Sequence, residues 1–209
     1  MGVVNSVKHR PGRFAWVLLA LTLLAPHSQA NDSQTVSNPL ATLHTSKGEI
    51  VIELLADKAP ITVANFLNYA KSGFYDGTIF HRVMRRFVVQ GGGFTVDMVE
   101  KPNGEPIVNE SKASGLRNDR WTVAMARTDD PNSARSQFFI NMRMNLSLDA
   151  RAGRDGYAVF GRVIEGQHVA RDISNVRTHR LGDYDDVPVE NVLLERVTIT
   201  EAKEAAAAP

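Results

Sequence analysis

Short apolar runs separated by turn residues dominate this chain of 209 residues. The runs are rich in Val, Ile and Phe, and Gly, Asn, Asp and Pro lie between them. Many short strands with few helices favour a closed β-barrel or a β-sandwich. The residue pattern by itself does not choose between these two architectures. The strand-like runs are residues 43–45, 49–55, 79–83, 86–90, 107–108, 121–126, 136–142, 157–163 and 192–200.

Two segments have the period of a helix instead. Pro60 suits the first turn of a helix, and Gly73 follows as a stop. Residues 167–174 predict a second helix, because Val169 and Ile173 lie one turn apart. The apolar face of the first helix has the i, i+3, i+4, i+7 spacing and consists of Val63, Phe66, Leu67 and Ala70.

The first thirty residues have the features of an export signal. Lys8, Arg10 and Arg13 precede an apolar stretch of twelve residues, Phe14 to Ala25. This stretch is too short for a membrane anchor, because a spanning helix needs about 20 residues. Small residues stand at the two positions that a signal peptidase inspects in Ser28-Gln29-Ala30. We therefore predict a signal peptide, residues 1–30, that is cleaved after Ala30 and leaves no membrane anchor.

Cleavage would leave 179 residues, which suits one domain with a sizeable core. We expect a flexible leader at 31–39, the domain at 40–200, and a flexible Ala-rich tail at 201–209. The whole chain has 24 basic and 23 acidic residues, and the signal contains three of the basic ones, so 21 basic residues remain against 23 acidic ones. This balance produces no field that attracts nucleic acid or anionic lipid. The chain has no cysteine, which excludes disulfides, cysteine nucleophiles and lipid-modified cysteine.

Three motifs stand out, one in the middle of the chain and two further on. The first is Phe80-His81-Arg82-Val83-Met84-Arg85-Arg86-Phe87-Val88-Val89-Gln90-Gly91-Gly92-Gly93, and in it Arg82 lies five residues before Phe87 and eight before Gln90. The second is Ser136-Gln137-Phe138-Phe139-Ile140-Asn141, and the third is Gly156-Tyr157-Ala158-Val159-Phe160-Gly161. In order and spacing these motifs resemble the cyclophilins, the peptidyl-prolyl cis/trans isomerases. The similarity extends from about Leu40 to Thr200.

The resemblance implies a mainly β fold, a closed eight-stranded antiparallel β-barrel capped by two α-helices. It also implies a monomer that needs no cofactor and no metal. His44, His168 and His179 agree with this, because they have no metal-ligand spacing. The run from Ala124 to Asn141 is most similar to bacterial cyclophilins. Together with the export signal, this similarity predicts the periplasm of a Gram-negative bacterium, with secretion to the medium as the alternative.

Rotation about an X–Pro bond needs neither a nucleophile nor a metal. The amide has a barrier of roughly 18–20 kcal/mol, and its cis and trans forms differ by only about 0.5–1 kcal/mol. A catalyst must bind the twisted amide better than either planar form. In the twisted form the proline nitrogen regains a lone pair, so a fixed cationic donor aimed at it lowers the barrier. Arginine fits this task, because its guanidinium stays charged and holds a rigid set of donors.

The resemblance assigns this role to Arg82, with Gln90 as its hydrogen-bond partner. It implies that the backbone of Ala126 and Arg127 pairs with the peptide, and that His81 is structural, since the reaction moves no proton. Ser147 stands where eukaryotic members carry a tryptophan, which implies weak binding of cyclosporin. Tyr157 replaces a histidine at the rim. The substrate-binding residues that we expect are Phe87, Val88, Met125, Ala126, Arg127, Phe139, Leu148 and Tyr157.

The function that we predict is isomerisation of X–Pro bonds in proline-containing segments of unfolded or newly exported proteins. One alternative is a non-catalytic chaperone that binds proline peptides in the same groove. Another is an unrelated β-barrel that binds a small apolar ligand. The presence of Arg82, Phe87 and Gln90 together favours the enzyme.

Overall fold

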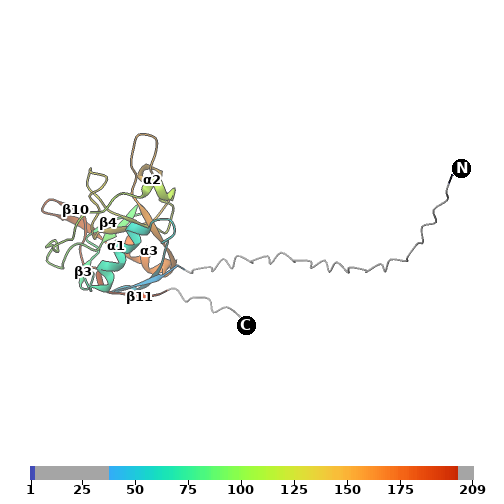
Figure 1. Cartoon of the computed structure of the whole chain (residues 1–209). Coiled ribbons are helices and arrows are strands. Elements are labelled where there is room, and N and C mark those ends of the chain that lie inside the picture. The colour runs from blue at the N-terminus through green and yellow to red at the C-terminus, as the bar shows by residue number, and fades with distance from the viewer. Residues whose placement is uncertain (3–37, 202–209) are drawn as a thin grey trace. The chain divides into compact units, whose positions relative to one another are not determined.

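The structure is a computed structural model that describes residues 1–2 and 38–201. The predicted signal peptide (from its third residue on), most of the predicted leader, and the tail after Glu201 lie outside the described residues. Nine strands form one antiparallel sheet in the order β3-β11-β1-β2-β8-β6-β7-β5-β4. Figure 1 shows the strands packed together with the helices in one domain. These strands are β1 (Leu40–Thr45), β2 (Gly48–Leu54), β3 (Thr78–Ile79), β4 (Arg82–Met84), β5 (Val88–Gly91), β6 (Thr122–Met125), β7 (Phe138–Asn141), β8 (Val159–Glu165) and β11 (Leu193–Thr200).

The sheet closes on itself through one short segment. β3 and β4 lie at opposite ends of the strand order, yet only Phe80 and His81 separate them in the chain. The Phe80 N–H donates to the Val192 carbonyl beside β11 at 3.0 Å, and Arg82 pairs with Gln90 of β5. The predicted fold class is therefore confirmed. The count of eight strands is wrong by one, because the interruption at residues 80–81 divides one predicted run into two strands.

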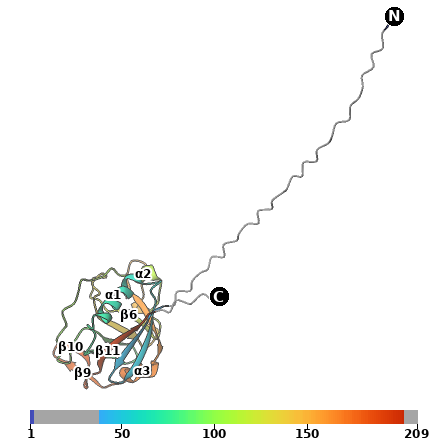
Figure 2. The ribbon, with the colours of Figure 1, turned by 60° about the horizontal axis from the view of Figure 1, so that its bottom comes forward.

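Both predicted helices are present. α1 (Pro60–Lys71) packs against β8 and β11, and α3 (Gln167–Ser174) packs against β2, β4 and β5. Figure 2 shows the two helices on opposite sides of the strands. The structure adds a third helix that we did not predict, α2 (Ser111–Ser114), a single turn.

Glu110, just before α2, caps the start of α1. Its carboxylate accepts hydrogen bonds from the Ile61 and Thr62 N–H groups, at 3.1 and 2.7 Å, and from the Thr62 hydroxyl. Ala59 at the N-cap position has no side-chain acceptor for these groups. An acidic side chain at a helix N-terminus also interacts favourably with the helix dipole.

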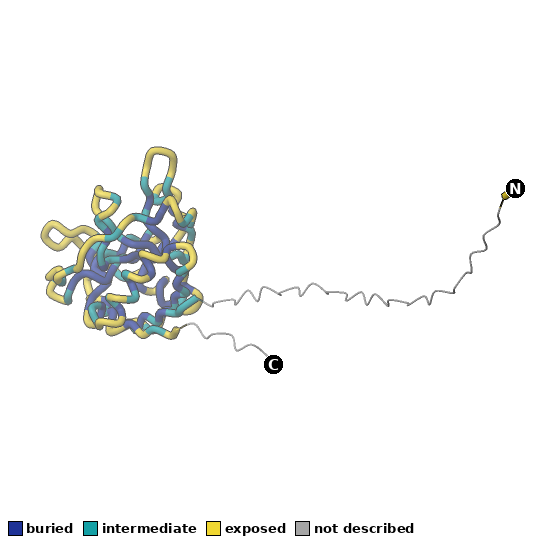
Figure 3. Tube along the Cα trace, in the orientation of Figure 1, coloured by how far each residue is buried: buried dark blue, intermediate teal, exposed yellow. Residues whose placement is uncertain are grey.

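Aromatic side chains fill the interior between α1 and the sheet. The Phe66 ring from α1 lies 5.2–5.6 Å from the rings of Tyr75, Phe138 and Phe160. Edge-to-face and offset contacts at this range are favourable. Gly92 is required beside them, because its φ is +82° and a Cβ there would lie 2.8 Å from Cε1 of Phe138. Figure 3 shows the buried segments gathered in the centre of the domain.

A two-stranded ribbon projects from the barrel beside β4. It consists of β9 (Thr178–Leu181) and β10 (Tyr184–Pro188), and β10 packs against β4. We did not predict this hairpin. Conversely, predicted run 107–108 forms only an isolated bridge, between Ile107 and Ala134.

The ends of the described domain are tied to it. The Asn38 side chain donates to Glu53 at 3.0 Å, and the Pro39 carbonyl accepts from Leu54 N–H at 2.9 Å. At the other end, Glu201 forms an exposed ion pair with Lys71 at 2.7 Å. No helix in the described ranges is long and apolar enough to cross a membrane.

Candidate active site

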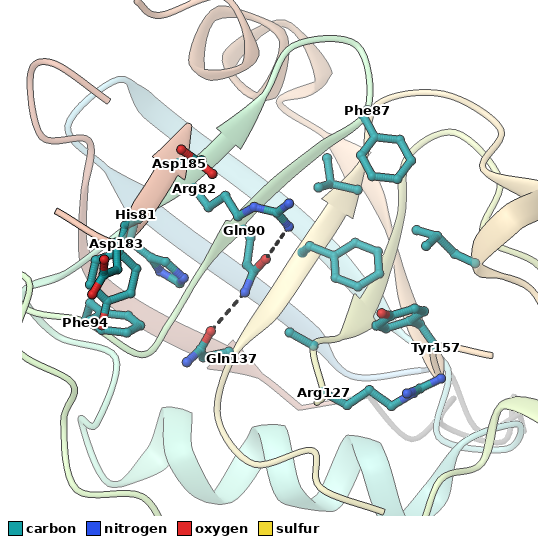
Figure 4. Close-up of a pocket in the computed structure, with 15 residues that line it drawn as sticks. His81, Arg82, Phe87, Gln90, Phe94, Arg127, Gln137, Tyr157, Asp183 and Asp185 are labelled. Carbon is teal, nitrogen blue, oxygen red and sulfur yellow. Dashed lines mark hydrogen bonds between the residues drawn. The ribbon is translucent and has the colours of Figure 1, made fainter. Parts of the chain in front are cut away.

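A cavity of about 650 Å³ lies on the outer face of the barrel wall. It is bordered by β4, β5 and β7, by the 3-10 turn η1 (Leu146–Leu148) and by the β9–β10 hairpin (Figure 4). The structure brings together nine of the ten side chains that we predicted for the site. These are Arg82, Phe87, Val88, Gln90, Ala126, Arg127, Phe139, Leu148 and Tyr157.

The period of the strands explains this convergence. Successive side chains of a strand point to opposite faces of the sheet, so every second residue of a strand reaches the cavity. β5 thus contributes Val88 and Gln90, and Phe139 comes from β7. The register places Gln90 opposite Arg82 on one side and opposite Phe139 on the other. Phe139, which is far from Arg82 and Gln90 in the sequence, therefore lies in one row with them.

Met125 is the one predicted site residue that the structure places elsewhere. It is 1% exposed and packs in the interior cluster, on the same face of β6 as Val123. Ala124 packs with the cavity walls instead. Our assignment of Met125 to the pocket side of its strand was therefore wrong by one residue. Because the side-chain period is 2, an error of one position moves a side chain to the other face.

A hydrogen-bonded row of three side chains crosses the cavity (dashed lines in Figure 4). Arg82 Nη1 donates to Gln90 Oε1 over a long distance of 3.5 Å. Gln90 Nε2 in turn donates to Gln137 Oε1 at 2.9 Å. No carboxylate of the described chain lies within ion-pair distance of Arg82. Its guanidinium thus keeps an uncompensated charge and donors for a ligand.

Apolar side chains line the cavity on one side of Arg82. Phe139 and Val88 form the floor of the cavity and are almost fully buried, and Phe87 and Leu148 are partly exposed at the edges of the cavity. The rings of Phe139 and Tyr157 meet edge to face, with their centroids 5.6 Å apart. A concave apolar wall with few polar groups suits a small apolar ring.

The Arg127 side chain supports the wall that Tyr157 forms. Its guanidinium lies over the Tyr157 ring, 4.6 Å from the centroid. Its Nε and Nη2 donate to the carbonyls of Gly156 and Asp155, at 3.2 and 3.0 Å. We had expected only the backbone of Arg127 to matter, and the structure adds this contact of the side chain.

Three buried asparagines hydrogen-bond to the backbone of residues that line the cavity. Asn145 Nδ2 donates to the carbonyl of Phe87 at 3.0 Å, and to Asn141. Asn141 donates to Asn118, whose own Nδ2 donates to the carbonyl of Leu148 at 3.1 Å. Buried polar networks that are fully satisfied rigidify their surroundings. We had not singled out these residues, since isolated asparagines in a sequence predict turns.

His81 lies beside Arg82 and is 5% exposed. Burial lowers the pKa of its imidazole to about 4, and the positive charge of Arg82 contributes to the same shift. Its ring packs against Phe94, with centroids 4.5 Å apart. The ring is therefore neutral at neutral pH.

The sequence analysis missed several residues of the cavity. Gln137 precedes the strand residue Phe138, and its place two positions before Phe139 could have assigned it to the same face. The hairpin residues 183–185 lie at and just after the turn Gly182-Asp183, and a two-residue Gly-Asp turn between strands is a recognised hairpin signal. Phe94 had no local signal, because it reaches the cavity from an irregular segment.

The arrangement defines a class of protein. A barrel with an apolar cavity on its outer face, beside an arginine that has no ion-pair partner within residues 38–201, suits binding of a small ring next to a polar amide. In the ranges that the structure describes, no group of three or more His, Cys, Asp or Glu side chains could hold a metal ion.

The comparisons with known proteins agree with this class. Residues 40–199 match the model of the family described as "Cyclophilin type peptidyl-prolyl cis-trans isomerase/CLD". Peptidyl-prolyl cis-trans isomerase cyp18 of Streptomyces antibioticus is 54% identical over 160 residues, which are 75% of this chain and 96% of that protein. Peptidyl-prolyl cis-trans isomerase B of Escherichia coli (strain K12) is 49% identical over 166 residues, 78% of this chain and 100% of that protein. The chain therefore belongs to the cyclophilin-type peptidyl-prolyl cis-trans isomerases, a family of isomerases.

Solved structures are similar as well. The crystal structure of a Cryptosporidium parvum cyclophilin, determined in the presence of the dipeptide Ala-Pro, superimposes with a TM-score of 0.65 at 25% identity. The match covers 78% of this chain and 99% of that one. Cyclophilin AquaCyp293 from Hirschia baltica has a TM-score of 0.61 at 24% identity over 76% of this chain and 73% of that one. The latter similarity concerns the fold alone.

Proposed function

We propose that this chain accelerates rotation about X–Pro bonds, with Arg82 as the group that stabilises the twisted amide. The observation that supports this most directly is the free guanidinium of Arg82 beside the apolar walls of Phe139 and Leu148. The pyrrolidine ring occupies the apolar side of the cavity. The proline nitrogen then faces the guanidinium.

Arg82 acts as a preorganised cationic donor in this mechanism. When the amide twists, conjugation is lost and the proline nitrogen becomes an acceptor. A donor already in position then stabilises the twisted form more than either planar form, which lowers the barrier. Gln90 holds the guanidinium through its Oε1, and Gln137 holds Gln90. The reaction needs no proton transfer, so the neutral state of His81 does not impede it.

The test compares the wild type with Arg82→Ala and Arg85→Ala in an NMR exchange assay on a short Ala-Pro peptide. Removing one preorganised donor typically lowers a rate about 100- to 1,000-fold, so we expect such a loss in Arg82→Ala. Arg85 carries the same charge three residues further on, but it is exposed and donates to Asn175 of the neighbouring loop. We expect Arg85→Ala to isomerise the peptide at the wild-type rate.

Two results would contradict the proposal. An Arg82→Ala variant that is folded by circular dichroism and as fast as the wild type would exclude the mechanism. A folded wild type that binds the peptide without accelerating exchange would favour the alternative, a chaperone that binds proline peptides.

We further propose that the substrates are exported proteins and that the enzyme acts in the periplasm as a monomer. The features that support this are the charged start and apolar stretch of residues 1–30. Expression of the full chain in a Gram-negative host tests it. We expect the product in the periplasmic fraction, with the mass of a chain that begins at Asn31. A product that keeps residues 1–30, or remains in the cytoplasm, would contradict it.

Weak inhibition by cyclosporin belongs to the same proposal. Ser147 is exposed in η1 next to the pocket residue Leu148, and it offers no ring to a large apolar ligand. Inhibition of the isomerase assay by cyclosporin measures this directly. Strong inhibition would show that other residues supply the contact.

A further inference from the structure

The cavity continues past Arg82, away from the apolar walls. Its far half is lined by His81, Phe94, Asp183, Tyr184 and Asp185, and we call this half the hairpin pocket. In Figure 4, Phe94 and Asp183 lie on one side of the row Arg82–Gln90–Gln137, and Phe87 and Tyr157 lie on the other. The proposed isomerisation explains the apolar half and leaves the hairpin pocket without a role.

Aromatic rings form the wall of the hairpin pocket. Tyr184 meets Phe94 edge to face at 5.5 Å between centroids, and Phe94 packs on His81 at 4.5 Å. The Phe94 carbonyl accepts from the Ile79 N–H at 3.0 Å, which ties this wall to the barrel. The hairpin itself is anchored by Val187 and Pro188 at its base, where both residues are buried. Phe94 is therefore held by packing before any ligand arrives, whereas Tyr184 is 44% exposed.

Carboxylates stand at the rim of the same pocket. Asp183 has no ion-pair partner within residues 38–201. Asp185 lies 3.7 Å from Nε of Arg180, but both side chains are about 70% exposed, so this pair contributes little. Neither aspartate is within ion-pair distance of Arg82. Two negative charges thus face the hairpin pocket, and Arg82, between the two halves of the cavity, donates to Gln90 rather than to either carboxylate.

His81 adds an acceptor rather than a charge. Its Nδ1 is buried and has no hydrogen-bond partner in the described part of the chain. A neutral imidazole has one N–H donor and one acceptor nitrogen, so Nδ1 is the acceptor in the tautomer that carries its proton on Nε2. An unpartnered buried acceptor next to the cavity suits a ligand that brings N–H donors.

We propose that the hairpin pocket binds a lysine or arginine side chain of the substrate. This proposal rests on the proposed function, and it names the substrate class of the same site. Ammonium and guanidinium groups bind over aromatic faces and pair with carboxylates. An extended peptide advances about 3.3 Å per residue, so a basic residue within about three positions of the proline can reach the pocket.

The experiment measures kcat/KM for a set of peptides with a central Ala-Pro. Each peptide carries Lys, Gln or Glu at one position, from about three residues before the proline to three after it. At one position we expect Lys to exceed Glu about three- to tenfold at low salt, the range of one or two exposed charge contacts. The ratio falls as salt rises, because about 0.1 M salt screens charges beyond about 10 Å.

The test variant and its control both change residues of the β9–β10 hairpin only. In Asp183→Asn/Asp185→Asn we expect the Lys-to-Glu ratio to fall to about one, since both rim charges are removed and Arg180 is released. The control is Asp186→Asn, which removes the same charge from the same hairpin. Asp186 does not line the cavity, and its φ of 60° is one that asparagine adopts readily. We expect Asp186→Asn to keep most of the wild-type ratio.

The outcomes separate the two proposals. If no peptide is isomerised, the proposed function fails. If Ala-Pro peptides are isomerised with the same kcat/KM for Lys and Glu at every position, or faster with Glu, the hairpin pocket has a different ligand and this proposal is overturned. A ratio that survives in Asp183→Asn/Asp185→Asn overturns it too. If circular dichroism shows that the double variant does not fold, the Lys-to-Glu ratio of kcat/KM is measured in Asp183→Asn instead. A ratio equal to that of the wild type would then overturn the proposal.

Discussion

The two faces of one strand wall, β5–β7–β6, behave differently although both are apolar. The inner face carries Val89, Phe138 and Ile140, which pack in the main core with α1. The outer face carries Val88 and Phe139 on the same strands, and they form a second, smaller cluster. In the part of the chain that the structure describes, no α-helix covers the outer cluster, which is bounded by Phe87, Leu148 and Tyr157 at its edges.

The difference teaches that hydrophobicity along a strand does not distinguish a core from a binding site. Neighbouring phenylalanines are 0% and 4% exposed, Phe138 inside and Phe139 outside. What differs is the cover. A face that a helix covers becomes core, whereas a face left open between loops becomes a cavity that a ligand can fill. The predictions below test whether the two faces can be altered separately.

The largest effect is expected for the inner face. Phe138→Ala removes edge-to-face contacts with Phe66, Tyr75 and Phe80 and leaves a closed void. Such truncations cost about 3–5 kcal/mol. Urea unfolding of the variant measures this loss. A variant that loses less than about 1 kcal/mol would show that the interior can collapse around the void.

The second prediction concerns His81, which lies between the two faces. Its folded-state pKa is about 4, against an ordinary value of 6.5. The unfolded chain therefore binds a proton that the folded chain does not between pH 6.5 and 4. This contribution to stability is complete above pH 6.5 and is lost as the pH falls to 4, up to about 3 kcal/mol.

Unfolding free energies of the wild type and of His81→Gln across this pH range provide the test. We expect the unfolding free energy of His81→Gln to fall less than that of the wild type between pH 6.5 and 4. The control is His168→Gln, which changes an exposed histidine on α3 and is expected to keep the wild-type pH dependence. Equal slopes in His81→Gln and wild type would contradict the low pKa.

A third prediction probes the outer face with the residue next to Phe138. Phe139→Ala removes the floor of the apolar pocket, and we expect kcat/KM on an Ala-Pro peptide to fall about 10- to 100-fold. Its loss of stability is expected to be smaller than that of Phe138→Ala, because the space it leaves opens into the cavity. Comparison of kcat/KM and urea midpoints in the two variants measures both effects. If Phe139→Ala lost more stability and kept its activity, the two faces would not be separable in this way.

The smallest effect is expected for Met125, which we had first placed on the outer face. Met125→Leu keeps the volume of an inner-face side chain, so its cost is expected to be below about 1.5 kcal/mol. We expect kcat/KM to equal that of the wild type, because the side chain does not line the cavity. Val88→Leu, an outer-face change on β5, serves as the comparison and is expected to alter KM. A change of KM in Met125→Leu would return Met125 to the site.

Local sequence signals predicted the regular elements well. Pro60 marks the start of α1, and the spacing of Val169 and Ile173 identified α3 at its observed bounds. The motif around Arg82 identified most of the site through resemblance to a family. Two of the errors arose where a signal spans only two residues, in the Phe80–His81 interruption and in the Gly182–Asp183 turn of the missed hairpin.

The sequence by itself determined most of the barrel strands and the two longer helices, because the period of apolar residues and the turn residues are local properties. It also carried the family motif, with Arg82, Phe87 and Gln90 at fixed spacing. Only the tertiary structure decided which face of β6 holds Met125, since register depends on partner strands. It alone placed Asp183 and Asp185 in the cavity of Arg82, about 100 residues away in the chain. Contacts at that separation depend on how the closed barrel brings its strands together, and no local pattern encodes them.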